Sequence, residues 1–186
     1  MSNDREHRIL FQLTGSIACF KACESISRLM KSGCAVQTVA TAGALRFVGA
    51  ATLEGLTGRT PFSDLYAAGR TMDHIHLARW ADVALLCPAT ANSMNRLAAG
   101  LADDAIGALF LAWEIGTKPY LIAPAMNATM WDHPATRAAR ERLAAFGARL
   151  LPVGDGRLAC GEAGEGRLLE VAEIEAELLK ALGRPR

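Results

Sequence analysis

The sequence has no excess of charge of either sign and few cysteines. Its 20 lysines and arginines are balanced by 19 aspartates and glutamates, which leaves a net charge of +1. Such a chain has no basic surplus to neutralise a phosphate backbone, so we expect no nucleic-acid partner. The five cysteines contain no Cys-x-x-Cys pair, which argues against both a disulfide framework and a zinc knuckle. We expect most of them to be small buried apolar residues.

Long hydrophobic runs are also missing. The apolar stretches have the length of strands and residues 1–8 are polar, so we expect no membrane span, no secretory signal and a cytoplasmic location. The chain has 186 residues, of which 51% are hydrophobic, enough for one good core. No internal repeat marks a boundary, and we therefore predict that residues 1–186 form a single domain.

The apolar run at residues 83–87 predicts the central strand of the fold. It shows no polar alternation, so both of its faces must be covered, which is typical of a parallel sheet between helices. We predict an α/β fold with a doubly wound parallel sheet of the Rossmann or flavodoxin type and helices on both faces. In the first helix, Ile17 and Phe20 are expected on the apolar face. The expected strands are 8–13, 35–40, 83–87, 120–124 and 149–153, and the expected helices are about 17–31, 44–56, 94–101, 105–113, 133–147 and 170–182.

Small polar residues follow the first three predicted strands. They are Thr14-Gly15-Ser16, Thr41-Ala42-Gly43 and Pro88-Ala89-Thr90-Ala91-Asn92-Ser93. Ligands of parallel sheets bind outside the carboxyl ends of the strands, so we expect a polar pocket there. A strand, a Gly-Ser turn and a helix aim free backbone N–H groups at an anion. The alternative is that Gly15 only makes a tight turn and Ser16 only caps the helix.

Two of the four histidines, His74 and His76, precede the central strand. On an extended segment a spacing of two would let both side chains face one way, as metal ligands do. No third ligand lies at a suitable spacing, so we predict no metal site. A partly satisfied surface histidine is the ordinary alternative for each.

The last two strands are followed by loops of small residues. Residues 125–131 carry an asparagine and two methionines, and residues 154–167 contain five glycines. A glycine-rich connection of that length is typical of a flexible lid. Cys160 lies in this loop and is the cysteine that we expect to be accessible.

Five motifs in order resemble those of the flavin-dependent cysteine decarboxylase family, which includes the phosphopantothenoylcysteine decarboxylases of coenzyme A biosynthesis. The resemblance covers about residues 8–169. The motifs are Gly15-Ser16-Ile17-Ala18, His74-Ile75-x-Leu77 before Arg79-Trp80-Ala81-Asp82, Pro88-Ala89-Thr90-Ala91-Asn92-Ser93, Pro124-Ala125-Met126-Asn127-x-x-Met130-Trp131 and Cys160-Gly161-Glu162-x-Gly164-x-Gly166.

The resemblance implies a role for each residue that matches. His74 would be the acid–base residue, Asn127 would bind the substrate carboxylate or amide, and Cys160 would donate a proton in the reductive half of the reaction. FMN would be bound by Thr14, Gly15, Ser16, Thr41, Thr90, Ala91, Asn92, Ser93 and Ala125. The substrate would be bound by Asn127, Met130, Arg157, Leu158 and Ala159, with residues 154–167 as a flexible clamp. His76 departs from the family pattern, in which a carboxylate is more common.

The implied activity is that of an FMN-dependent carboxy-lyase that converts phosphopantothenoylcysteine to phosphopantetheine. Loss of the carboxyl group leaves electrons on the α-carbon. Oxidation at the β-carbon with loss of the thiol proton gives a thioaldehyde, whose C=S bond can accept those electrons. The resulting enethiolate is then reduced, and a thiol such as Cys160 is a reasonable proton donor at neutral pH.

Other functions stay open at this point. Relatives that modify peptides decarboxylate a C-terminal cysteine and stop at the enethiol. Other relatives on this scaffold are regulatory subunits that bind phosphatases, and prenylated-flavin synthases have a similar fold. The resemblance also implies a homo-oligomer, a trimer or a dodecamer of trimers, with the flavin between subunits.

Overall fold

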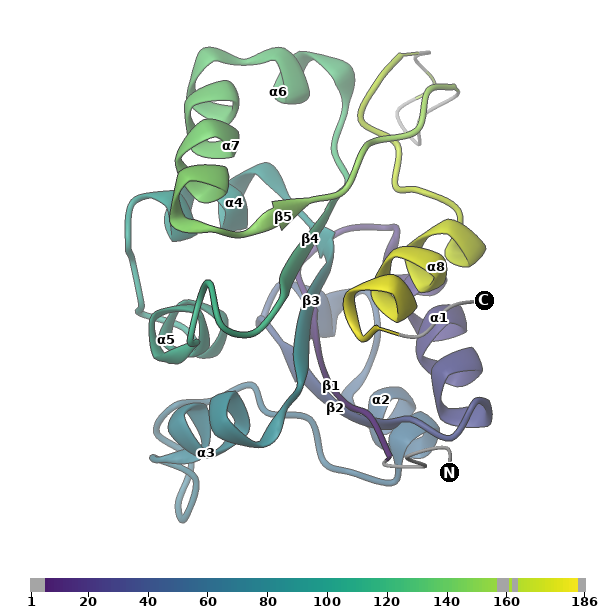
Figure 1. Cartoon of the computed structure of the whole chain (residues 1–186), viewed down its shortest axis with the longest axis vertical. Coiled ribbons are helices and arrows are strands. Elements are labelled where there is room, and N and C mark those ends of the chain that lie inside the picture. The colour runs from purple at the N-terminus through teal and green to yellow at the C-terminus, as the bar shows by residue number, and fades with distance from the viewer. Residues whose placement is uncertain (1–5, 157–160, 162–163, 184–186) are drawn as a thin grey trace.

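The computed structural model describes residues 6–156, 161 and 164–183, and its centre is a five-stranded parallel sheet (Figure 1). The strand order is β2-β1-β3-β4-β5, and each neighbouring pair is parallel. This is the doubly wound flavodoxin-type order, so the predicted fold class is confirmed. The strands are β1 (Arg8–Leu13), β2 (Ala35–Ala40), β3 (Val83–Ala89), β4 (Tyr120–Pro124) and β5 (Arg149–Leu150).

Helices cover both faces of the sheet. In Figure 1, α1, α2 and α8 lie on one face, and α3, α4, α5 and α7 lie on the other. All seven residues of β3 are buried, as its unbroken apolar run predicts. The helices are α1 (Cys19–Lys31), α2 (Ala50–Thr57), α3 (Asp73–Trp80), α4 (Ala91–Ala98), α5 (Ala105–Ala112), α6 (Ala128–Asp132), α7 (Pro134–Phe146) and α8 (Val171–Ala181).

Several predicted elements differ in detail. The helix expected at 44–56 is divided into a 3₁₀ turn at Ala44–Arg46 and α2, because Gly49 is extended between them. The strand expected at 149–153 is only two residues long. Helices α3 and α6 were not predicted, because the sequence analysis considered the histidine segment as extended and residues 125–131 as a loop of small residues.

The apolar face predicted for the first helix was wrong at its start. Ile17 and Phe20 are 57% and 62% exposed. The face of α1 that packs on the sheet is instead Cys19, Ala22, Ser25, Ile26 and Leu29. These residues follow the spacing of a helix that begins at Cys19, two residues later than expected.

The segment after α2 extends the sheet at its edge. Phe62 is fully buried and bridges Val39 of β2 in parallel. Its N–H donates to the Thr38 carbonyl at 3.0 Å, and its carbonyl accepts from the Ala40 N–H at 2.9 Å. The connection is therefore anchored beside the carboxyl end of β2. Among the helices in the described ranges, none has the length and apolar character needed to cross a membrane.

Two helical glycines provide a matched test of how closely α5 packs against the segment before it. A Cβ at Gly107 in α5 would lie 2.4 Å from the Leu101 carbonyl oxygen, whereas a Cβ at Gly55 in α2 has nothing within 4 Å. We expect Gly107→Ala to lower the free energy of unfolding by about 2 kcal/mol through overpacking. Gly55→Ala should raise it by about 0.5–1 kcal/mol, because alanine loses less backbone entropy. Urea unfolding of both variants measures this, and a Gly107→Ala protein as stable as wild type would contradict the packing.

Candidate functional site

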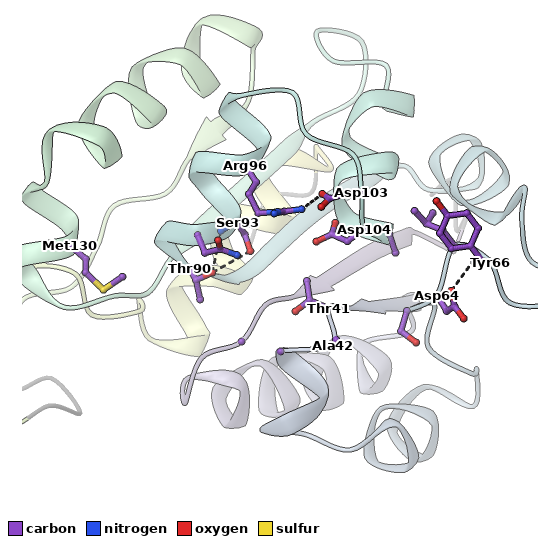
Figure 2. A pocket seen from close by; sticks show the side chains of 16 residues that line it. Thr41, Ala42, Asp64, Tyr66, Thr90, Ser93, Arg96, Asp103, Asp104 and Met130 are labelled. Carbon is purple, nitrogen blue, oxygen red and sulfur yellow. Dashed lines mark hydrogen bonds and ion pairs between the residues drawn. The ribbon is translucent and has the colours of Figure 1, made fainter.

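The carboxyl ends of β1, β2 and β3 open into one cleft of about 610 Å³ (Figure 2). This volume is within the range of small-molecule and cofactor sites. The polar pocket predicted at this edge of the sheet is therefore present. Six residues with predicted ligand contacts line it: Gly15, Thr41, Thr90, Asn92, Ser93 and Met130.

Glycines bring two of the cleft loops into contact. A Cβ on Gly15 would lie 3.1 Å from the carbonyl carbon of Gly43, closer than a side chain is normally tolerated. The Thr41 N–H donates to the Leu13 carbonyl at 3.1 Å, which keeps the loop after β2 beside the loop after β1. Glycine at 15 is thus favoured by close approach, because any other residue would force the Gly43 backbone to shift. The two loops form a cradle of backbone and small side chains.

A buried hydroxyl joins the loops after β1 and β3. Thr14 is fully buried. Its Oγ1 donates to the Pro88 carbonyl at 2.6 Å and accepts from the Thr90 N–H at 3.0 Å. Thr90 in turn caps α4, because its Oγ1 accepts from the Ser93 N–H. Thr14 does not line the cleft, so its described contacts position Thr90 and Ser93 rather than reach the cleft.

The remaining predicted cofactor residues lie close to this cradle. Ser16 Oγ accepts from the Ala18 N–H at 3.2 Å in the turn before α1. Helix α1 begins at Cys19 and has no side-chain cap, so the capping role considered for Ser16 is wrong. Ala91 and Ala125 are buried, and the Ala125 N–H donates to the Ala89 carbonyl at 2.9 Å. The ends of β3 and β4 are therefore adjacent, so residues 125–130 continue the same edge of the sheet.

One end of the cleft is acidic, which the sequence analysis did not predict. Figure 2 shows Met130 at one end and Asp64 with Tyr66 at the other, with Arg96 reaching towards Asp103 between them. Arg96 and Asp103 form an ion pair, and Asp104 caps α5 by accepting from the Gly107 N–H at 2.8 Å. Between these ends, Thr41, Thr90 and Ser93 provide neutral hydroxyl groups that are suited to an anionic phosphate, whereas Asp64 would repel it (Figure 2).

The sequence analysis did not predict several residues that line the cleft, because the sequence gives little indication of their position. Residues 63–66 lie in a stretch that resembles an ordinary connection. Arg96 follows Asn92 by four positions, so extending the cleft face along α4 would have found it. The missed residues are Ser63, Asp64, Leu65, Tyr66, Arg96, Asp103, Asp104 and Ala105.

The Asn127 side chain is oriented by the cap that it provides for α6. Its Oδ1 accepts from the Met130 N–H at 2.9 Å and caps α6. The amide orientation is thereby fixed, which leaves the Nδ2 group as a donor. A donor is what a substrate carboxylate or amide carbonyl requires, but Asn127 is not among the residues that line the cleft, so its role stays a prediction.

The base of the glycine-rich loop is joined to the Asn127 segment. Gly154 and Arg167 form an antiparallel bridge, and the Met126 N–H donates to the Gly166 carbonyl at 2.9 Å. Gly166 has a φ of +121°, and a Cβ there would lie 2.5 Å from the Met126 carbonyl oxygen. Only glycine fits at this contact. The predicted substrate residues Arg157, Leu158 and Ala159, and Cys160, lie outside the described residues.

The structure places His74 away from the cleft of its own chain. It is a half-buried residue near the start of α3, the helix that packs against α5, and it is not among the residues that line the cleft. Within the described ranges its Nδ1 is buried without a hydrogen-bond partner. Because α3 is a helix, His74 and the exposed His76 do not face one way, contrary to the extended geometry considered above. The described residues contain no group of three or more potential metal ligands.

The other cysteines are poor proton donors or nucleophiles. Cys19, Cys34 and Cys87 are buried and Cys23 is half-buried, as predicted. Burial raises the pKa of the Cys19, Cys23 and Cys87 thiols, most strongly for Cys87. They stay protonated at neutral pH and lack access to a ligand in the cleft.

Comparisons with known proteins agree with the motifs. The model of the Flavoprotein family matches residues 1–183. The chain is 40% identical over 167 residues to the coenzyme A biosynthesis bifunctional protein CoaBC of Mycobacterium tuberculosis, covering 90% of this chain and 39% of that protein. It thus spans about two fifths of the length of that relative.

Two solved structures with the same fold are also similar in sequence. One is a PPC decarboxylase cysteine-to-serine mutant complexed with pantothenoylaminoethenethiol, with a TM-score of 0.86, 31% identity, and coverage of 96% of this chain and 100% of that chain. The other is the FMN-dependent cysteine decarboxylase SpaF, with a TM-score of 0.78, 31% identity, and coverage of 95% and 97%. The expected resemblance is confirmed: the chain belongs to the Flavoprotein family and is homologous to its flavin-dependent cysteine decarboxylases.

Proposed function

We propose that this chain is an FMN-dependent carboxy-lyase that converts phosphopantothenoylcysteine to phosphopantetheine in coenzyme A biosynthesis. The observation that carries the proposal is the cleft itself. A glycine and hydroxyl cradle at Gly15, Thr41, Thr90 and Ser93 continues along the sheet edge to the Asn127 segment. The identity to the CoaBC protein favours this substrate.

The residues of the cleft fit FMN. Its glycine and hydroxyl residues offer neutral groups for the phosphate, and its volume of about 610 Å³ leaves room for a flat ring. FMN would supply a redox-active ring that takes a hydride from the β-carbon of the substrate and later returns it. Gly15, Ser16, Thr41, Thr90 and Asn92–Ser93 would hold it, with Ala91 and Ala125 packed behind.

The chain's own side chains would then act on the substrate cysteine. Asn127 would hold the carboxylate through Nδ2, because its Oδ1 is occupied in the α6 cap. Met130, which is 46% exposed at the end of the cleft, would contact the apolar part of the substrate. Cys160 would protonate carbon in the reductive half, since the buried thiols cannot reach it. Arg157, Leu158 and Ala159 would contact the substrate from the clamp at residues 154–167.

His74 would serve the cleft of a neighbouring subunit. It lies outside the cleft of its own chain, yet it would have to reach the substrate thiol to act as the acid–base residue. A homo-oligomer, a trimer or a dodecamer of trimers, would satisfy both conditions if α3 of one subunit met the cleft of the next. Symmetric assembly would then complete every site in the same way.

A peptide ending in cysteine is the second candidate substrate. The identity to SpaF, at 31% over 95% of this chain, equals the identity to the PPC decarboxylase. Such an enzyme would release the oxidised enethiol and would not need Cys160. The presence of Cys160 therefore favours phosphopantothenoylcysteine.

The proposed function makes a prediction about both the cofactor and the substrate. We expect the purified protein to be yellow, to contain FMN, and to turn phosphopantothenoylcysteine into phosphopantetheine, with little product from a cysteine-ended peptide. Absorbance spectra and mass spectrometry of both reactions measure this. A colourless protein that takes up no FMN supplied in excess would refute the proposal, and preferential turnover of the peptide would favour the second candidate.

The second prediction tests His74. His74→Asn should retain FMN but lose about 10²–10⁴-fold in kcat, the usual contribution of a general acid or base. The second variant, Gly43→Phe, should not bind FMN, because a bulky side chain would fill the cleft. The backbone φ of −66° at this position accepts a side chain. Co-expression of the two inactive chains should restore about one quarter of wild-type activity, because a site is complete only when an intact cleft meets an intact His74. Co-expressed chains that remain inactive would exclude action between subunits.

The third prediction tests Cys160. Cys160→Ser should still release carbon dioxide but accumulate an enethiol lighter than phosphopantetheine by two hydrogens. The relative crystallised with pantothenoylaminoethenethiol is itself a cysteine-to-serine mutant, which is consistent with this expectation. Cys23→Ser is the control, and it should give the normal product. Normal phosphopantetheine from Cys160→Ser would remove Cys160 from the mechanism.

A further inference from the structure

Arg70 closes the loop that forms the acidic end of the cleft. Its Nη1 donates to the Pro61 carbonyl at 3.0 Å, nine residues earlier in the chain. Its guanidinium carbon lies 5.2 Å from the centre of the Phe62 ring. Since Phe62 is buried and paired with β2, Arg70 ties the end of the loop to a fixed point on the sheet.

The loop between these points has one packed side chain and an exposed tip. Ser63, Asp64, Leu65 and Tyr66 line the cleft. Leu65 is partly buried against the core on this face of the sheet. Tyr66 is 84% exposed, and a local turn holds its backbone, with its N–H donating to Asp64 Oδ1 at 2.8 Å. A local turn restrains an exposed residue weakly. A contact that closes the loop at its base therefore limits how far the exposed part of this wall can move.

Arg70 also holds the start of the helix that carries His74. Its Nε donates to Asp73 Oδ2 at 2.7 Å. Asp73 is the first residue of α3 and directly precedes His74. The side chains of Arg70 and Asp73 are 29% and 25% exposed, so solvent screens this pair less than a fully exposed one. One guanidinium thus contacts the loop base, the sheet edge and α3.

We propose that Arg70 is a positioning residue that fixes the cleft wall at residues 63–66 and the start of α3 relative to each other. The planar guanidinium can donate in two directions while stacking on a ring, which a lysine ammonium cannot do. The inference rests on the proposed function, because Arg70 would affect FMN binding by holding residues 63–66 and would affect kcat by holding the helix that carries His74.

The test compares variants at a temperature where all of them are folded. Arg70→Met should raise the Kd for FMN and lower kcat per bound flavin, each by about tenfold, because charge-assisted hydrogen bonds to both segments are lost. Asp73→Asn keeps the donor to Pro61, so it should lower kcat and leave the FMN Kd unchanged. Arg70→Lys should recover part of the kcat of wild type. Fluorescence titration with FMN and single-turnover assays measure these quantities.

Arg28→Met is the matched control. Arg28 also donates from Nε to a carboxylate, that of Glu175 Oε2 at 3.0 Å, but it joins α1 to α8, and neither residue lines the cleft. It should leave both quantities at wild-type values. Equal losses in Arg28→Met, or a lower Tm for Arg70→Met with unchanged Kd and kcat, would overturn the positioning role. An inactive His74→Asn beside a fully active Arg70→Met would overturn the role of Arg70 alone, whereas an active His74→Asn would overturn the proposed function and this inference with it.

Discussion

The cleft depends on one buried hydrogen-bonding group, the hydroxyl of Thr14. It sits where β1 ends, and it both donates to the Pro88 carbonyl and accepts from the Thr90 N–H. An unpaired buried N–H or carbonyl would destabilise the fold. The Thr14 hydroxyl provides hydrogen-bond partners for one carbonyl and one N–H of the turn after β3. By fixing Thr90 it also fixes the cap of α4 and the positions of Asn92 and Ser93. The same contact therefore closes the core and shapes the ligand site.

A second constraint is that the sheet edge is shared by segments far apart in the chain. Ala125 bonds to Ala89, and Gly166 bonds to Met126, so the loops after β3 and β4 and the stem of the glycine-rich loop form one continuous backbone surface. The close contact at Gly166 admits no side chain. The contact at Gly166 therefore couples the described end of the glycine-rich segment to the segment that carries Asn127.

The sequence alone predicts the sheet and the loops at its carboxyl edge, but it does not predict every residue that lines the cleft. Runs such as Val83–Cys87 identify buried parallel strands because no amphipathic helix has that pattern, and the loops at their carboxyl ends follow from the topology. The wall at residues 63–66 could not be predicted in this way. Its position depends on the pairing of Phe62 with β2 and on contacts made by Arg70, which are set by tertiary structure rather than by local periodicity. Helix α3 was missed for a related reason: its last carbonyls are bound by Lys118, which is distant in the chain.

The helix that carries His74 is held by basic side chains at both of its ends. Lys118 donates to the Ala78 and Ala81 carbonyls at 2.5 and 2.9 Å, where a cation is favourable at a helix C-terminus. Burial lowers the pKa of this ammonium, which is the cost of placing it there. With Arg70 at its other end, α3 is held by side-chain contacts at both ends. The proposed action of His74 in a neighbouring subunit would therefore use a helix that is already in place, and no loop closure would be needed to position the histidine.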